Sequence, residues 1–209
     1  MESKDFRRIY IRHADKEYVN GDATLYKHDP GITTEGIEKT KMVAKHLIDQ
    51  WGPPDLIISS PYKRTRETAE IMNAVLSEKQ SIHIDTDIAE YLGNHRHVSI
   101  DVTESTLTHD PPHPETFSQM KDRVKSHHSK ITNYAKKKKE GTIWIITHGL
   151  IIKQLASLIH INMPKDFPTL TCLSIVDGDK MTKSELLIFN DNNIDDNNID
   201  NEKDISYSI

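Results

Sequence analysis

Five side chains spread along the sequence are of the types that bind and transfer a phosphoryl group. They are His13, His148, Arg12, Arg64 and one carboxylate in the segment Asp87 to Glu90. Two guanidinium groups at one spot favour an oxyanion, and phosphate matches their geometry best. A neutral imidazole can attack phosphorus, a second imidazole and the arginines can stabilise the developing charge, and a carboxylic acid can protonate the leaving oxygen. These parts are sufficient for phosphoryl transfer without a metal ion.

Each of these side chains follows a short apolar run that indicates a β-strand. The runs are Phe6–Ile11, Leu56–Ile58, Ile82–Ile84 and Ile143–Ile146. Stretches with helical periodicity separate them, which is typical of a three-layer α/β/α sandwich with a mostly parallel central sheet. Ligands of such sheets bind beyond the carboxyl ends of the strands. We therefore expect the five side chains to converge at one edge of the sheet.

The expected helices and the remaining strands complete this pattern. A helix over Glu35–Trp51 can be capped by Thr33 or Thr34, and a second is predicted to start with Ser60 as its cap and Pro61 in its first turn. The other expected elements are a long helix from Pro114 that ends in Lys136–Lys139, a helix over Leu150–Ile161, and a hairpin of Thr171–Val176 with Lys180–Phe189. The helix starts at Pro61 and after Gly149 are predicted to offer free N–H groups to an anion.

Five segments, in order, resemble motifs of the histidine phosphatase superfamily, whose fold is phosphoglycerate mutase-like. They are Arg12-His13-Ala14, Asp29 to Gly36, Ser59 to Ala69, Ile88 to Gly93, and Thr147-His148-Gly149. The resemblance covers about residues 6–176.

The resemblance implies a role for each candidate residue. His13 would be the nucleophile that becomes phosphohistidine, Arg12, Arg64 and His148 would complete the phosphate pocket, and Glu90 would be the proton donor. From the residues alone, Asp87 could replace Glu90, and Glu104 and Glu115 are more distant alternatives.

Two departures from the family pattern bear on activity. Ala14 stands where the family usually has glycine, which would cost about 1 kcal/mol if that position needs a positive φ. The stretch Asp15 to Asn20 lacks the run typical of mutases, and Asn20 matches the family's phosphate-binding asparagine only after a one-residue shift. We therefore expect a metal-independent phosphomonoester hydrolase. The alternatives are a phosphoglycerate-type mutase and a catalytically weak protein that only binds phosphorylated ligands.

Composition divides the chain into a neutral body and an acidic tail. Residues 190–209 hold six acidic residues and one lysine, which equals the net charge of −5 of the whole chain. We expect residues 1–189 to form the phosphatase domain and the Asn/Asp-rich tail to be disordered. The neutral body gives no electrostatic case for nucleic acid. The sequence favours a cytoplasmic protein that acts on a phosphorylated small molecule or a phosphoprotein, with no cofactor, no metal and no membrane partner.

Four other features of the sequence could serve either in chemistry or only in the structure, and we choose between the two for each. The histidine-rich segment 92–114 could bind zinc or line a substrate lid, and we favour the lid. Cys172 lacks the arginine spacing of a cysteine phosphatase and is expected to be a buried strand residue. Lys136–Lys139 are expected to form the solvated end of a helix, and Glu67 is expected to be a surface charge.

Overall fold

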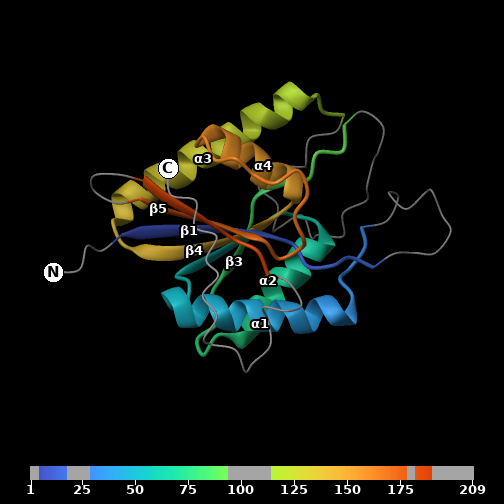
Figure 1. Cartoon of the computed structure of the whole chain (residues 1–209), viewed down its shortest axis with the longest axis vertical. Helices are drawn as coiled ribbons and strands as arrows, with labels where there is room; N and C mark the ends of the chain where they lie inside the picture. The colour runs from blue at the N-terminus through green and yellow to red at the C-terminus, as the bar shows by residue number, and fades with distance from the viewer. Residues whose placement is uncertain (1–4, 18–28, 94–113, 178–181, 190–209) are drawn as a thin grey trace.

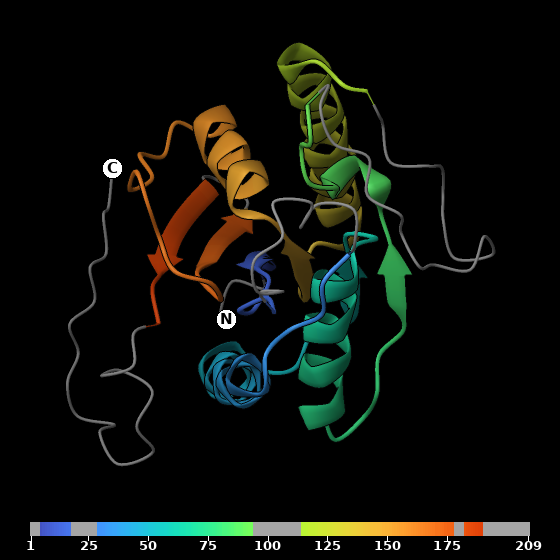
Figure 2. The ribbon, with the colours of Figure 1, turned by 90° about the vertical axis from the view of Figure 1, so that its right-hand side faces the viewer.

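A single six-stranded sheet lies between two pairs of helices (Figures 1 and 2). The computed structural model describes residues 5–17, 29–93, 114–177 and 182–189. The elements in chain order are β1 (Phe6–Arg12), α1 (Thr34–Trp51), β2 (Leu56–Ser59), α2 (Lys63–Val75), β3 (Ile82–Ile84), the 3-10 helix η1 (Thr86–Ile88), α3 (Phe117–Lys138), β4 (Gly141–Thr147), α4 (Gly149–Leu158), β5 (Cys172–Asp177) and β6 (Thr182–Leu187). The predicted three-layer α/β/α architecture is confirmed. Asn20, the histidines of 95–113 and the acidic tail lie outside the described residues.

The strand order β3-β2-β4-β1-β5-β6 places the strands that carry the candidate residues next to one another. β1, β2, β3 and β4 pair in parallel, whereas β5 is antiparallel to β1 and β6 is antiparallel to β5. In this register Arg12 lies opposite Thr147, and Ser59 lies opposite Ile146. The carboxyl ends of β1, β2 and β4 therefore coincide, and the residues that follow them share one edge of the sheet.

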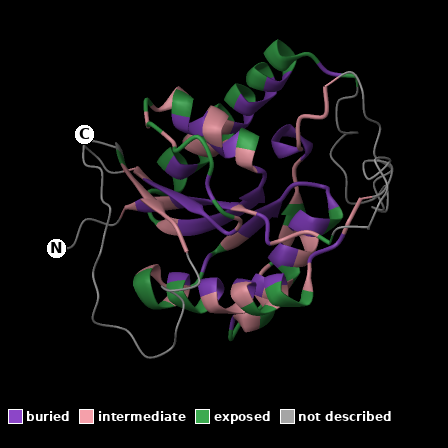
Figure 3. Ribbon diagram, turned by 45° about the vertical axis from the view of Figure 1, so that its right-hand side comes forward, coloured by how far each residue is buried: buried purple, intermediate pink, exposed green. Residues whose placement is uncertain are grey.

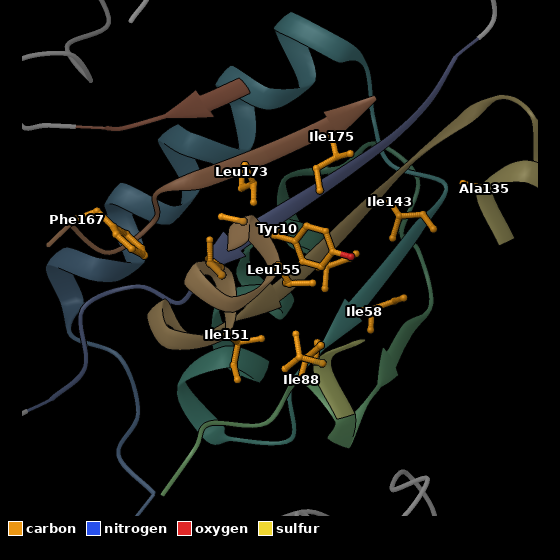
Figure 4. Packing of buried hydrophobic residues seen from close by; sticks show 14 of the residues in the cluster. Tyr10, Ile58, Ile88, Ala135, Ile143, Ile151, Leu155, Phe167, Leu173 and Ile175 are labelled. Atoms are coloured by element: carbon orange, nitrogen blue, oxygen red, sulfur yellow. The ribbon is translucent and has the colours of Figure 1, made fainter. Parts of the chain in front are cut away.

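Each face of the sheet packs against one pair of helices through its own core. Successive residues of a strand point to opposite faces, so Tyr10 packs toward α3 and α4, while Ile9 and Ile11 pack toward α1 and α2. Figure 4 shows the first cluster, in which Tyr10 lies among apolar residues of the sheet and of α4 such as Leu155. The central strands β1, β2 and β4 and the inner helix faces are largely buried, and the outer helix faces are exposed (Figure 3). The sheet is therefore packed on both faces, which holds the edge that carries the candidate residues in a fixed position.

Most element boundaries agree with the prediction, but the start of α2 does not. Thr33 caps α1 by accepting from Gly36 N at 2.9 Å, and the terminal hairpin is present as β5 and β6. α2 begins at Lys63 instead of Pro61, because the first helical N–H groups bond to the carbonyl of Tyr62. Ser60 therefore does not cap the helix.

The ends of two other helices lie close to the predicted positions. α3 ends at Lys138, and the exposed lysines of its last turn form the solvated helix end that the sequence predicted. α4 ends at Leu158, three residues before the predicted end, since His160 has a φ of 60°, outside the helical region. Cys172 is fully buried in β5, and burial raises the pKa of its thiol, as expected for a structural residue.

Candidate active site

His13 is held in one orientation directly after β1. Its backbone N–H donates to Thr147 O at 2.9 Å, and its side-chain Nδ1 lies 2.7 Å from Ala14 O. A carbonyl oxygen only accepts, so Nδ1 carries the proton and Nε2 keeps its lone pair. The side chain is 6% exposed, and burial, followed by the positive charge of Arg64, lowers its pKa well below the ordinary value. His13 is therefore a neutral imidazole at neutral pH, which a nucleophile requires.

His148 lies beside His13, because it follows β4 and forms the N-cap of α4. The two ring centres are 5.3 Å apart with an angle of 62° between the planes. Nε2 of His148 lies 2.8 Å from Ser60 Oγ, and Nδ1 lies 3.3 Å from Nη2 of Arg64. Burial first, and then the charge of Arg64, lowers the pKa of His148 well below its ordinary value. The site thus contains a second neutral imidazole.

Arg64 reaches the histidines from the first turn of α2 and is 4% exposed. Its Nη1 lies 3.2 Å from Asp29 Oδ1, and its Nη2 donates to Glu90 Oε2. Asp29 also accepts from the backbone N–H of Lys63 at 2.5 Å. Asp29 therefore occupies the N-terminus of α2, where the sequence predicted free N–H groups for an anion.

Glu90 lies within reach of the histidines, whereas the alternative acids that the structure describes are engaged elsewhere. Its Oε2 is 3.9 Å from His148 Nδ1, and its side chain is 35% exposed. Asp87 accepts from Lys130 Nζ at 2.7 Å. Glu115 is buried in a bidentate pair with Arg123 at 2.6 and 2.9 Å. Geometry therefore favours Glu90 over Asp87 and Glu115, while Glu104 lies outside the described residues.

Arg12 lies near both histidines, on the side of the loop that leads into β5. Its Nη1 donates to the carbonyl oxygen of Phe167, and a Cβ added at Gly149 would lie 3.5 Å from its Nε. After burial and the charge of Arg64, the charge of Arg12 also contributes to the lowered pKa of His13 and His148. The structure thus brings together all five predicted side chains.

Ala14 is not strained in place of the usual glycine. Among the described residues, the non-glycine positions with positive φ are Lys139, His160 and Leu170. Ala14 is fully buried, and its N–H donates to Thr68 Oγ1 at 3.1 Å. The expected penalty of a positive φ is therefore absent.

Sequence reasoning missed three residues around the site. The sequence places Asp29 only within the segment before α1, predicts Ser60 as the cap of α2, and predicts Glu67 as a surface charge. Glu67 is half-buried and accepts from Ile32 N at 2.8 Å, and a Cβ at Gly31 would lie 2.7 Å from its carboxylate. Its actual role is to hold the segment after Asp29 against α2. The sequence contains one indication of these roles: Ser60 lies only four residues before Arg64, so it is expected near the site. Nothing in the sequence indicates the contacts of Asp29 and Glu67.

The described residues offer neither a cluster of metal ligands nor a membrane-spanning helix. Within these residues, no group of three or more His, Cys, Asp and Glu side chains is arranged to hold a metal ion. No helix among them has the length and apolar character needed to cross a bilayer.

The fold is shared with several solved phosphatases and mutases. A phosphoglycerate mutase from Bacillus anthracis str. Sterne has a TM-score of 0.68 at 17% identity, with 89% of this chain and 94% of that chain covered. The protein histidine phosphatase SixA complexed with tungstate has a TM-score of 0.58 at 16% identity, with 87% and 96% covered. A phosphoserine phosphatase from Entamoeba histolytica has a TM-score of 0.58 at 18% identity, with 86% and 94% covered.

Sequence comparison gives the family directly. No curated protein sequence matches the chain. The model of the histidine phosphatase superfamily (branch 1) matches residues 9–191. That span contains both histidines and both arginines of the site, and the structural neighbours have the same fold. The chain therefore belongs to the histidine phosphatase superfamily, branch 1.

Proposed function

We propose that this protein is a metal-independent phosphomonoester hydrolase that works through a phosphohistidine intermediate on His13. The observation that carries the proposal is the pair of buried neutral imidazoles, 5.3 Å apart, beside the guanidinium of Arg64. The substrate is a phosphorylated small molecule or a phosphoprotein, since the pocket residues address only the terminal phosphoryl group.

Arg12, Arg64 and His148 bind the phosphoryl oxygens in this proposal. The guanidinium groups supply the positive charge and fixed N–H donors that a phosphate dianion needs. Arg64 contacts Glu90 in the structure, so the arriving dianion replaces that carboxylate as a partner of the guanidinium. Glu90 is thereby released from Arg64 and can reach the leaving oxygen as the acid of the next step.

The first chemical step transfers the phosphoryl group to His13. The lone pair of Nε2 attacks phosphorus, because Nδ1 is committed to Ala14 O. The Nε2–P bond forms while the bond from phosphorus to the leaving oxygen breaks. Glu90 gives its proton to that oxygen, and Arg12, Arg64 and His148 stabilise the charge on the other three oxygens.

The second step returns the enzyme to its starting state. A water molecule loses a proton to the Glu90 carboxylate as its oxygen attacks phosphorus. The Nε2–P bond breaks, inorganic phosphate leaves, and His13 is again neutral. The two steps sum to ester plus water giving alcohol plus phosphate.

The test is hydrolysis of p-nitrophenyl phosphate in excess chelator by wild type, His13→Ala and the matched control His46→Ala. His46 is an exposed histidine of α1 whose ring packs edge-on against Phe189, a residue outside the candidate site. We expect wild type and His46→Ala to be equally active and His13→Ala to be inactive. An acid-labile phosphoryl label on His13, trapped in an acid-free quench, would support the intermediate.

Other outcomes separate the alternatives. Equal activity of His13→Ala and wild type would show that His13 is not the nucleophile. Folded but inert wild type that still transfers label from a phosphodonor to His13 would favour a mutase. A protein that binds inorganic phosphate without label or turnover would favour a binding function.

A further inference from the structure

Ser60 contacts His148 across 88 residues of sequence. Its Oγ lies 2.8 Å from Nε2 of His148, and Ser60 is fully buried. Its backbone is fixed, since its N–H donates to Ile146 O at 2.9 Å. The hydroxyl is thus aimed at the imidazole from a rigid position.

The His148 ring is fixed, so each nitrogen keeps one set of neighbours. The ring is 1% exposed and packs edge-on against Tyr62 and His13, with centres 5.2 and 5.3 Å away. Nδ1 faces Arg64 at 3.3 Å and Glu90 at 3.9 Å, while Nε2 faces Ser60. A ring flip would have to displace these packed aromatic neighbours.

A neutral imidazole has one N–H, so its two nitrogens take opposite roles. In the structure Arg64 can only donate, which makes Nδ1 of His148 the acceptor and makes Nε2 the donor to Ser60 Oγ. The oxygens of a phosphate dianion only accept. A His148 that stays neutral must therefore carry its proton on Nδ1 when phosphate is bound, and its Nε2 must then accept from the Ser60 hydroxyl.

We propose that Ser60 is a positioning residue whose hydroxyl lets His148 exchange its donor and acceptor nitrogens when phosphate binds. A serine hydroxyl both donates and accepts, so it serves either tautomer, which alanine cannot do. Ser60 does not touch substrate and acts only through His148. The inference rests on the proposed phosphate-binding role of His148.

The first experiment observes the tautomer without relying on activity. Full-length chain labelled with 15N is titrated with inorganic phosphate, and the ring nitrogens of His148 are followed by long-range 1H–15N spectra. Signals of His148 are assigned by their loss in His148→Gln. We expect the Nε2–H form without phosphate and the Nδ1–H form at saturation. An unchanged tautomer at saturation would overturn the inference.

The second experiment uses Ser60→Ala, Ser60→Thr and the matched control Ser59→Ala. Ser59 is equally buried and loses the same atom, but its Oγ donates to the carbonyl of Ser60. In Ser60→Ala the phosphate complex has a buried Nε2 without a partner, so we expect phosphate affinity and kcat to fall about tenfold, with a smaller change in KM. Ser60→Thr should restore most of the loss, and Ser59→Ala should resemble wild type.

The two proposals fail in different ways. If hydrolysis depends on His13 but Ser60→Ala behaves like Ser59→Ala, the inference about Ser60 is wrong and the phosphatase function stands. If wild type hydrolyses no ester but phosphate still converts His148 to the Nδ1–H form, the phosphatase function is wrong and the role of Ser60 stands. If Ser60→Ala does not fold, the tautomer of wild type and the kinetics of Ser60→Thr decide.

Discussion

Asp29 and Arg64 form a buried ion pair in which each side chain is 4% exposed. Burial raises the pKa of Asp29 above its ordinary value, although the N–H of Lys63 and the charge of Arg64 act in the opposite direction. The folded environment therefore disfavours the Asp29 carboxylate relative to water. Because Asp29 is buried despite this unfavourable effect and pairs with Arg64, it is consistent with a role in holding Arg64, the arginine that we propose to bind phosphate, in place.

The raised pKa of Asp29 predicts how Asp29→Asn changes stability with pH. An acid whose pKa is higher in the folded state binds more protons when folded, so stability falls as pH rises from about 3.9, the unfolded value, through the folded pKa. The asparagine side chain does not titrate, so the variant should gain stability relative to wild type as pH rises from about 3.5 to about 7. Urea unfolding across this range measures the difference. A relative gain for wild type as pH rises would show that the Arg64 pair outweighs burial.

Asp85 should show the opposite dependence. Burial alone would raise its pKa, but the hydrogen bond from His127 Nδ1 at 2.8 Å and the charge of His127, together with the N–H of Asp87 and the charge of Lys130, outweigh burial, and the net pKa is lowered. Asp85 therefore contributes stability that is present above its unfolded pKa of about 3.9 and is lost as pH falls through the folded pKa. Asp85→Asn should be less stable than wild type at about pH 7, and the gap should narrow at about pH 3. A constant gap would mean that the loss is one of packing alone.

Glu90→Gln tests the proton donor through its dependence on the leaving group. An alkyl phosphate needs a proton on its leaving oxygen, whereas p-nitrophenolate leaves readily without one. We expect kcat/KM, which reports transfer to His13 and not the later hydrolysis, to fall about 10²–10⁴-fold for the alkyl ester and much less for the nitrophenyl ester. Asp87→Asn is the comparison, because Asp87 is paired with Lys130. If Asp87→Asn, and not Glu90→Gln, loses more activity with the alkyl ester than with the nitrophenyl ester, Asp87 is the proton donor.

Ala14→Gly tests whether the departure from the family pattern weakens the enzyme. Ala14 has no positive φ and is fully buried, so glycine adds backbone freedom to the unfolded chain without relieving strain. We expect a loss of about 0.5–1 kcal/mol in the free energy of unfolding and no gain in kcat. Denaturant unfolding and steady-state kinetics measure the two quantities. A clear rise in kcat would show that the alanine side chain obstructs the site.

The parts of the site that depend on strand order could be predicted, and those that depend on side-chain contacts could not. Apolar runs located β1 and β4, and the rule for parallel sheets placed His13 and His148 at one edge. The choice between Glu90 and Asp87 needed the path of η1, which turns Asp87 toward Lys130. Local propensity also placed the start of α2 at Pro61 instead of Lys63, because propensity does not take into account that the Ser60 side chain contacts His148, 88 residues away.

β4 has a consequence for how this protein can change. It hydrogen-bonds to β1 along one edge and to β2 along the other, so ladder hydrogen bonds set the separation of His13, His148 and the start of α2. The ladder fixes the two histidines, whereas the connecting segments contribute Asp29, which holds Arg64, and Glu90. Substitutions in those segments that spare Asp29 and Glu90 would therefore leave the spacing of His13 and His148 unchanged.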